Sequence, residues 1–253
     1  MRNTPLIEVQ NLFQKIGTQE ILRGVTLSIF SGETLVLLGK SGGGKSVFLR
    51  HLIGLMKPDL GKVLFEGKDI TRFNERQLEP IRCKIGMLFQ DGALFDSLSV
   101  FDNVAFPLRE HRMRDEKKIQ EKVHEALALV NMTGHDGKMP INLSGGMRKR
   151  VALARAIISP PSIILYDEPT AGLDPIVSDS INRLIRRLQR QLKVTSVVVT
   201  HDMVSAYHVG DRIALLDHGR IHFCGSPKQL RASCDPVIRD FIEGRSENNS
   251  EIE

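Results

Sequence analysis

The sequence lacks the features that would indicate a membrane span or an aromatic binding surface. Its 253 residues include no tryptophan and only two tyrosines. No run approaches the roughly 18 consecutive apolar residues that a transmembrane helix requires. The first residues also lack the apolar core of a signal peptide. The sequence therefore predicts a protein that stays in the cytosol, which still permits attachment to a membrane through a partner.

Cysteine is also scarce. Cys83, Cys224 and Cys234 are odd in number and include no C-x-x-C pair. A zinc site or a disulfide framework usually needs paired cysteines at regular spacing. These three residues are therefore expected to be reduced thiols of a cytosolic protein.

Charge of one sign is in small excess. The chain has 35 Lys and Arg residues against 30 Asp and Glu, giving a net charge of +5 and a pI of about 9.2. Basic and acidic residues alternate in segments such as 109–118, which is typical of a solvated surface. Without an aromatic stacking platform, no nucleic-acid partner is expected. A modest positive charge is compatible with proximity to anionic lipid headgroups.

Short apolar runs alternate with amphipathic segments, a pattern that predicts an α/β fold. One predicted helix, residues 45–56, has Val47, Phe48, Leu52 and Leu55 on its buried side and is stopped by the segment 57–59. A second helix is predicted at residues 175–192. Strands are predicted at residues 6–9, 25–29, 34–38, 62–65, 84–89, 163–166 and 195–200, with a closing hairpin at 212–216 and 220–224.

The middle of the chain changes character. Residues 100–159 are mostly helical in pattern, and Ile119, Val123, Leu127 and Val130 recur at helical spacing after a capping Asp115. We expect one domain over residues 1–245, with a helical subdomain inserted at about 98–160. Residues 246–253 are polar and acidic, and they are expected to be a disordered tail.

A glycine-rich loop between a predicted strand and a predicted helix indicates a phosphate site. It fits the pattern G-x-x-x-x-G-K-S. Glycines let successive N–H groups curl toward phosphate oxygens, and the helix N-terminus adds partial positive charge. Its lysine suits the β- and γ-phosphates, and its serine suits Mg²⁺. The alternative is a flexible loop without a ligand. The residues concerned are Gly39, Lys40, Ser41, Gly42, Gly43, Gly44, Lys45, Ser46 and the adjoining Val47.

Two carboxylates follow the apolar strand at 163–166. Neighbouring residues on an extended chain point in opposite directions, so Asp167 can face a metal and its waters while Glu168 faces an attacking water. This arrangement suits phosphoryl transfer to water. The alternative is that both are capping or solvated loop residues. The segment 169–174 favours a defined turn instead.

Two further polar residues follow predicted strands. His201 comes after the strand at 195–200, at the carboxyl edge where α/β sheets bind ligands. It can contact a γ-phosphate and hold the attacking water, although a lone histidine is more often structural. Gln90 follows the strand at 84–89. Its side chain can reach Mg²⁺ and report on the γ-phosphate.

The segment Leu143-Ser144-Gly145-Gly146-Met147 precedes another helical pattern. Ser144 suits a helix cap, and the two glycines permit close backbone approach. An ordinary capped helix start is one reading. The same geometry also makes an anion site. Because the chain already has a phosphate loop, this second site needs a second phosphate.

Together these motifs resemble the ATP-binding subunits of ABC transporters over nearly the whole chain. The resemblance implies a P-loop NTPase core with a parallel sheet, an N-terminal antiparallel β subdomain and an inserted helical subdomain. It implies an ATPase that uses ATP and Mg²⁺ and works as a head-to-tail homodimer. By it, Glu168 and His201 are catalytic, Ser46, Gln90 and Asp167 surround Mg²⁺, with Asp167 acting through water, and Ser144, Gly145, Gly146 and Asp174 contact the partner's ATP.

A closer resemblance is to the ATPases of Mla/Mce-type lipid transporters. It lies in residues 87–95, 100–111 and 235–241, and in Met147, where Gln is commoner. It implies transport of phospholipid or a related lipid with an MlaE-type integral permease and an Mce-domain lipid-binding protein. The family's permease docks on the stretch after Gln90. The chain would be peripheral, on the cytoplasmic face of the inner membrane.

Other functions compete with this one. An importer ATPase for another solute, such as an amino acid, is the alternative within the class. A soluble ABC ATPase acting on ribosomes or DNA usually has two cassettes, and a P-loop kinase explains neither Ser144 nor His201. Besides Met147, two residues depart from the family pattern. Ile16 replaces an aromatic that stacks on adenine, with Phe13 as a candidate substitute, and Lys40 replaces a proline and adds charge near the phosphates.

Overall fold

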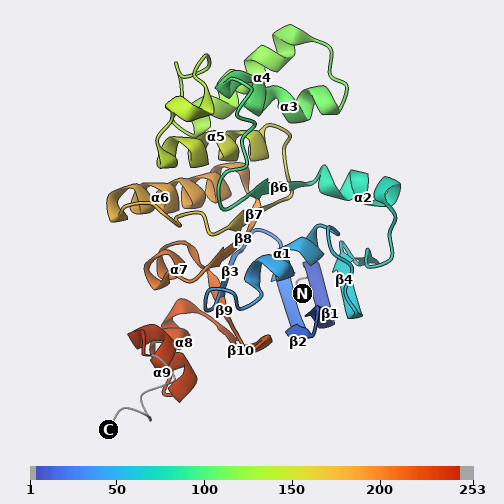
Figure 1. The fold of residues 1–253 in the computed structure, drawn as a ribbon, viewed down its shortest axis with the longest axis vertical. Helices are drawn as coiled ribbons and strands as arrows, with labels where there is room; N and C mark the ends of the chain where they lie inside the picture. Colours follow the sequence, from blue (N-terminus) through green and yellow to red (C-terminus); the bar gives the residue numbers. More distant parts are fainter. Residues whose placement is uncertain (1–3, 246–253) are drawn as a thin grey trace.

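The fold contains two β-sheets with helices packed around them (Figure 1). The computed structural model describes residues 4–245, so the predicted disordered tail lies outside it. The first sheet is antiparallel, in the strand order β2-β1-β4-β5, and forms the expected N-terminal β unit. Its strands are β1 (Pro5–Ile16), β2 (Gln19–Phe30), β4 (Leu60–Phe65) and β5 (Lys68–Asp69).

The second sheet has six strands in the order β10-β9-β3-β8-β7-β6. All neighbouring pairs are parallel except β10 with β9, which form the predicted closing hairpin. This arrangement confirms the predicted α/β fold with a parallel sheet. The strands are β3 (Thr34–Leu38), β6 (Ile85–Leu88), β7 (Ile163–Asp167), β8 (Thr195–Thr200), β9 (Arg212–Asp217) and β10 (Arg220–Gly225).

Both faces of the parallel sheet are buried. Along β3, Leu35 and Leu37 join the apolar core shared with the antiparallel sheet and α1 (Lys45–Leu52). Val36 and Leu38 point the other way, into the core formed with the helices of the second half of the chain. All residues of β3, β7 and β8 are buried, as continuous apolar strands require.

The middle of the chain is helical, as predicted, and lies at the top of Figure 1. Asp115 caps the second of these helices by accepting a hydrogen bond from the Lys118 N–H. The four apolar residues predicted at helical spacing, Ile119, Val123, Leu127 and Val130, are buried. Treating residues 98–160 as a separate subdomain stays a prediction. The helices are α3 (Val100–Glu110), α4 (Glu116–Leu129), the short η1 (Pro140–Asn142) and α5 (Gly145–Ile157).

The C-terminal helices cover the sheet and end the described chain. The bounds predicted for α6 (Pro175–Leu192) are confirmed, and its buried face is the expected one, with Ile181, Leu184, Ile185 and Leu188. Among residues 4–245, no helix is both long and apolar enough to cross a membrane. The remaining helices are α7 (Met203–Val209), α8 (Pro227–Arg231) and α9 (Pro236–Glu243).

Three local predictions were wrong. The first helix ends at Leu52 because Gly54 turns the chain with a φ of +65°, so Leu55 is exposed. β1 and β2 are longer than predicted, since each extends into a hairpin around Gly17. The short β5 and α2 (Glu75–Arg82) were not predicted, although Asn74 opens α2 with a capping box.

Candidate functional site

The register of the parallel sheet brings the candidate residues to one edge. Leu38 of β3 lies opposite Thr200 of β8, and Val199 of β8 lies opposite Asp167 of β7. β6 continues the row on the far side of β7. The residues that follow these strands are therefore neighbours. They are Gly39, Gln90, Glu168 and His201.

The loop between β3 and α1 requires glycine for reasons of space and conformation. Gly42 and Gly44 have φ values of +74° and +94°. A Cβ at Gly39 would lie 2.6 Å from the carbonyl oxygen of Leu216. Gly44 is also the N-cap of α1 and makes no side-chain cap, which leaves the first N–H groups of the helix available to an anion.

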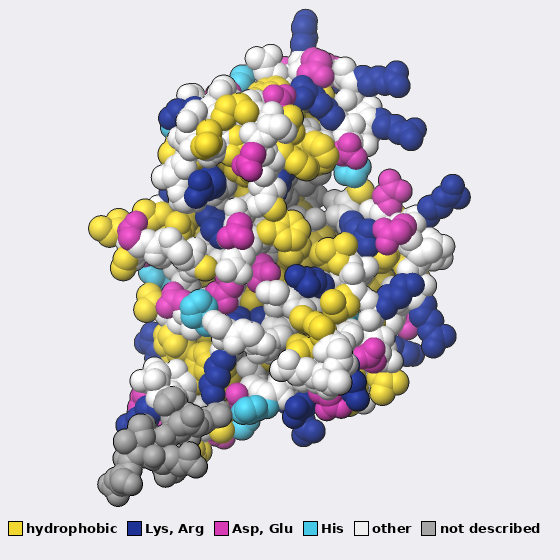
Figure 2. All heavy atoms as spheres, in the orientation of Figure 1, with side chains coloured by type: hydrophobic (Ala, Val, Ile, Leu, Met, Phe, Trp, Pro, Cys, Tyr) yellow, Lys and Arg dark blue, Asp and Glu magenta, His cyan; other side chains and the backbone are white. Residues whose placement is uncertain are grey.

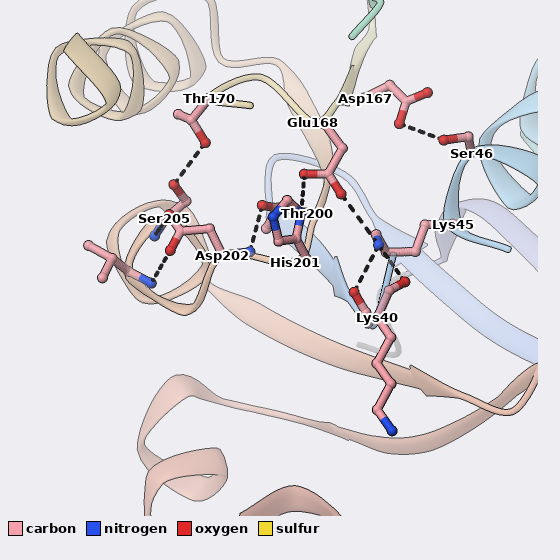
Figure 3. Close-up of polar contacts among 12 residues, drawn as sticks. Lys40, Lys45, Ser46, Asp167, Glu168, Thr170, Thr200, His201, Asp202 and Ser205 are labelled. Atoms are coloured by element: carbon pink, nitrogen blue, oxygen red, sulfur yellow. Dashed lines mark hydrogen bonds and ion pairs between the residues drawn. The ribbon is translucent and has the colours of Figure 1, made fainter. Parts of the chain in front are cut away.

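Lys45 and Glu168 form a buried ion pair at the end of the loop (Figure 3). The ammonium nitrogen lies 3.3 Å from one carboxylate oxygen of Glu168, and it donates to the carbonyls of Gly39 and Lys40 at 2.8 and 2.9 Å. His201 donates from Nδ1 to the other oxygen of Glu168, at 3.0 Å. Glu168 therefore lies between a cation and an imidazole.

Ser46 and Asp167 form a second pair beside the first. The Ser46 hydroxyl donates to Asp167 at 2.8 Å. Burial raises the pKa of the Asp167 carboxyl, the hydrogen bond from Ser46 lowers it, and the charge of Glu168 raises it further. A hydroxyl, a carboxylate and the Gln90 amide at the same edge are oxygen donors that fit Mg²⁺. A bound Mg²⁺ would neutralise phosphate charge there.

The two acids point in different directions, but for a different reason than predicted. Asp167 ends β7, and its side chain turns toward Ser46. Glu168 is not extended, since its φ is +45° in the left-handed region. That turn of the backbone directs its side chain toward Lys45 and His201 (Figure 3).

These groups open onto one cavity of about 360 Å³. Polar and phosphate-loop residues line one part of it, and the aliphatic Ile16 and Ile21 line another. The predicted site residues on its wall are Ser41, Gly42, Gly44, Lys45, Ser46, Val47, Gln90, Glu168 and His201. Phe13 does not line this cavity.

The other predicted residues do not line this cavity, and Gly39, Gly43 and Asp167 adjoin it. The Lys40 side chain points away from Lys45 and Glu168 (Figure 3), so its charge is not directed at the phosphate loop. Ser144 caps α5 through the Met147 N–H at 3.3 Å. Asp174 caps α6. Gly145 lines a separate cavity of about 460 Å³, and a Cβ on Gly146 would meet Val177 of α6 at 2.6 Å.

Sequence reasoning missed three residues of this region. Ile21 and Ala171 line the 360 Å³ cavity, and no chemical signal marks either of them. Lys149 is a buried lysine of α5 whose side chain reaches the backbone of Gln90 and Glu168. A signal was present for Lys149, because it lies at helical spacing from the apolar Leu153 and Ile157.

The arrangement has the parts that phosphoryl transfer to water needs. Loop N–H groups and Lys45 can hold phosphates, and oxygen donors can hold a divalent cation. Glu168 can polarise a water, with His201 fixing its orientation. Since the carboxylate accepts from Nδ1–H, a neutral His201 ring keeps Nε2 as an acceptor.

Comparison with known proteins agrees with this chemistry. The family model described as "ABC transporter" matches residues 22–171. The chain is 45% identical over 239 residues to the Probable ribonucleotide transport ATP-binding protein mkl of Mycobacterium tuberculosis, spanning 94% of this chain and 67% of that protein. It is 41% identical over 245 residues to the Intermembrane phospholipid transport system ATP-binding protein MlaF of Haemophilus influenzae, spanning 97% and 93%.

Solved structures are similar over most of their length. CbiO1 from Clostridium perfringens, part of the ABC transporter complex cbiONQ, superposes with a TM-score of 0.83 at 30% identity, covering 94% of this chain and 95% of that one. The dimeric ATP-binding cassette MJ0796, in a post-hydrolysis state with ADP and Pi, gives a TM-score of 0.79 at 32% identity, covering 87% and 98%.

Proposed function

This chain belongs to the ABC transporter family as an ATP-binding subunit with ATPase activity, and from that premise we propose that it drives the movement of phospholipid or a related lipid. The resemblance to lipid-transporter ATPases carries the lipid assignment, and a surface groove gives the matching docking site. Several residues in the stretches that resemble lipid-transporter ATPases, 87–95 and 100–111, line a single groove of about 490 Å³. The assignment also agrees with the 41% identity to MlaF over nearly the full chain.

The groove has the character of a docking site for an amphipathic helix. Figure 2 shows hydrophobic side chains gathered around a hollow between the α3–α4 region and α2. Phe95 and Phe106 lie 4.7 Å apart, centroid to centroid, and Phe95 is 44% exposed. Arg82, His111 and Arg155 add basic groups to the lining. Such a surface suits an apolar helix face with acidic residues at its margin.

We place a helical segment of an MlaE-type integral permease in this groove. An Mce-domain lipid-binding protein completes the transporter through that permease. The chain is then peripheral, on the cytoplasmic face of the inner membrane. We propose no nucleic-acid partner.

Within the chain, each polar group of the cavity has a role in hydrolysis. Residues 39–47 hold the phosphates of ATP, with Lys45 as the charged donor. Ser46 and Gln90 would hold Mg²⁺, with Asp167 acting through water, and the ion would offset phosphate charge. Glu168 polarises the attacking water, and His201 orients it beside the γ-phosphate. The contacts of Glu168 with Lys45 and His201 support these roles.

Ser144, Gly145, Gly146 and Asp174 act on the ATP of a second copy. They do not line the 360 Å³ cavity of their own chain. Ser144 and Asp174 are exposed, which leaves them accessible to a partner. The dimeric state of the similar cassette MJ0796 supports a head-to-tail homodimer. Two ATP molecules would then lie between the two chains.

Phe95→Glu is expected to abolish co-purification of the permease, because it places a charge among the apolar residues of the groove. The tagged full-length chain is recovered from its native membranes in mild detergent, and associated proteins and lipids are identified by mass spectrometry. Leu60→Glu, at an exposed position at the start of β4 and outside the groove, should retain the partners. Recovery of a permease and an Mce-domain protein with bound phospholipid is the expected wild-type result. A permease recovered in equal amount with Phe95→Glu would contradict the docking site.

Ile16→Tyr is expected to lower the KM for ATP by about threefold to tenfold, the effect of one added stacking contact. Ile16 is 49% exposed at the aliphatic part of the cavity, where the base must lie once the phosphates occupy the loop. The value of kcat should not change, because stacking is equal in the ground and transition states. Steady-state kinetics checks this, with Leu60→Tyr as the control. An unchanged KM would place the base elsewhere.

A second candidate is transport of another solute. The 45% identity to a protein described as a ribonucleotide transport subunit favours it, since cargo is chosen by the permease rather than by the ATPase. The same co-purification decides between the two functions. Recovery of a permease without an Mce-domain protein or phospholipid would support the second.

A further inference from the structure

Lys149 is a buried cation that the roles above do not use. Only 5% of its surface is exposed, and it lies on α5 at helical spacing from the buried Leu153 and Ile157. Burial lowers the pKa of its ammonium group, and the charges of Asp91, Asp167 and Glu168 raise it. A charged group in such a place is costly unless it is bonded. Its partners therefore indicate why it is there.

Both of its hydrogen-bond partners are backbone carbonyls at the edge of the parallel sheet where the candidate site lies. The Lys149 ammonium donates to the carbonyl of Gln90 and to the carbonyl of Glu168 at 3.4 Å. These carbonyls follow β6 and β7, which are neighbours in the sheet. One side chain of the helical region thus joins the two segments that carry the Mg²⁺ ligand and the water-polarising acid.

The backbone of Glu168 needs such support. Its φ of +45° is disfavoured for a residue with a Cβ. Its N–H donates to the carbonyl of Val199 at 2.9 Å, and its carbonyl accepts from Ala171 at 3.2 Å as well as from Lys149. A change in the backbone angles of Glu168 would redirect its carboxylate relative to His201.

A second basic side chain of α5, that of Arg155, contacts the segment that follows Gln90. Arg155 donates to the carbonyls of Gly92 at 2.8 Å and Ala93 at 2.7 Å, and it lines the 490 Å³ groove. The segment after Gln90 is therefore attached to α5 at two points. One point adjoins the groove and the other adjoins the catalytic edge.

We propose that Lys149 is a positioning residue that holds the backbones of Gln90 and Glu168 together, so that a displacement of the segment after Gln90 reaches the Glu168 carboxylate. This inference rests on the role proposed above for Glu168. Lys149 does not line the 360 Å³ cavity. It acts by keeping Glu168 aligned with His201.

Lys149→Met tests this, because methionine fills similar volume and donates no hydrogen bond. The value of kcat is expected to fall by about 10- to 100-fold, the usual cost of misplacing a reacting group. The KM for ATP and the affinity for a fluorescent ATP analogue should stay within about threefold, since the phosphate loop is untouched. Lys149→Arg, which keeps charge and donors, should restore most of kcat. Lys118→Met, on the exposed side of α4, is the matched control.

The turnover of a double variant distinguishes this role from a purely structural one. In a Glu168→Gln background, adding Lys149→Met should cause no further loss, because Lys149 acts through Glu168. Wild-type kcat in Lys149→Met, failure of Lys149→Arg to restore it, or a full additional loss in the Glu168→Gln background would each overturn the inference. Wild-type turnover in Glu168→Gln alone would instead contradict the proposed function. Loss of nucleotide binding in Lys149→Met with retained binding in Lys149→Arg would assign Lys149 to nucleotide binding and overturn it too.

Discussion

Glu168→Gln is expected to lower ATP turnover by about 100- to 10,000-fold, the usual contribution of a general base, while ATP binding persists. Glutamine keeps the shape of the side chain and can still accept the Nδ1–H of His201, but it cannot take up negative charge. Turnover is measured as phosphate release under saturating ATP. Binding is measured with a nonhydrolysed fluorescent analogue.

The same substitution should also favour the dimer. In the wild-type chain the Glu168 carboxylate lies 3.3 Å from the Lys45 ammonium, where it competes with phosphate for that cation. Removing its charge should strengthen ATP binding, and ATP that is not hydrolysed should hold two chains together. Light scattering after size exclusion should then show an ATP-dependent dimer. Glu121→Gln, on the exposed side of α4, should turn over ATP at the wild-type rate. Wild-type turnover in Glu168→Gln would exclude it as the base.

Ser144→Arg is expected to abolish hydrolysis while leaving ATP binding to the same chain within about threefold. Ser144 is exposed and does not line its own chain's cavity, so the added side chain cannot reach the ATP bound there. In a head-to-tail dimer it would stand where the partner's γ-phosphate must approach. Turnover and analogue binding on the same preparation check the two halves of this expectation.

Loss of the helix cap must be separated from this effect. Ser144 accepts the Met147 N–H, and losing such a cap costs roughly 1 kcal/mol of stability. Ser144→Ala loses the cap without adding bulk, and it should keep far more turnover than Ser144→Arg. If Ser144→Arg weakens ATP binding as much as it lowers hydrolysis, Ser144 acts on the ATP bound by its own chain instead.

Mixing two inactive variants tests the assembly itself. A dimer of one Ser144→Arg chain and one Lys45→Ala chain has one composite site with both residues intact. An equal mixture should therefore recover up to roughly a quarter of the wild-type rate if the sites of the symmetric dimer act independently. Activity no higher than that of the separate variants would count against a site shared between chains.

Elements marked by a capping residue, a proline or an unbroken apolar run were predicted from the sequence. The bounds of α6 and β8 were predicted without error, because Pro175 marks a helix start and an unbroken β-branched run marks a buried strand. The first helix is four residues shorter than predicted, because Gly54 turns the chain before the stop signal at Lys57-Pro58. The extended β1–β2 hairpin was missed because exposed polar residues interrupt its apolar alternation.

The chemistry of each segment can be read from its own residues. The glycines and Lys45 of the phosphate loop, the carboxylates after β7 and the histidine after β8 are read from spacing within a few residues. Which of these residues meet depends on the folded chain, because strand order and register follow from pairing between distant segments. In the folded chain, Glu168 lies between Lys45 and His201, and Ser144 lies outside the cavity. Lys149 of α5 contacts the backbone at the ends of two strands. A side chain that acts on the backbone of another segment has no local signature, so its role became visible only in the folded chain.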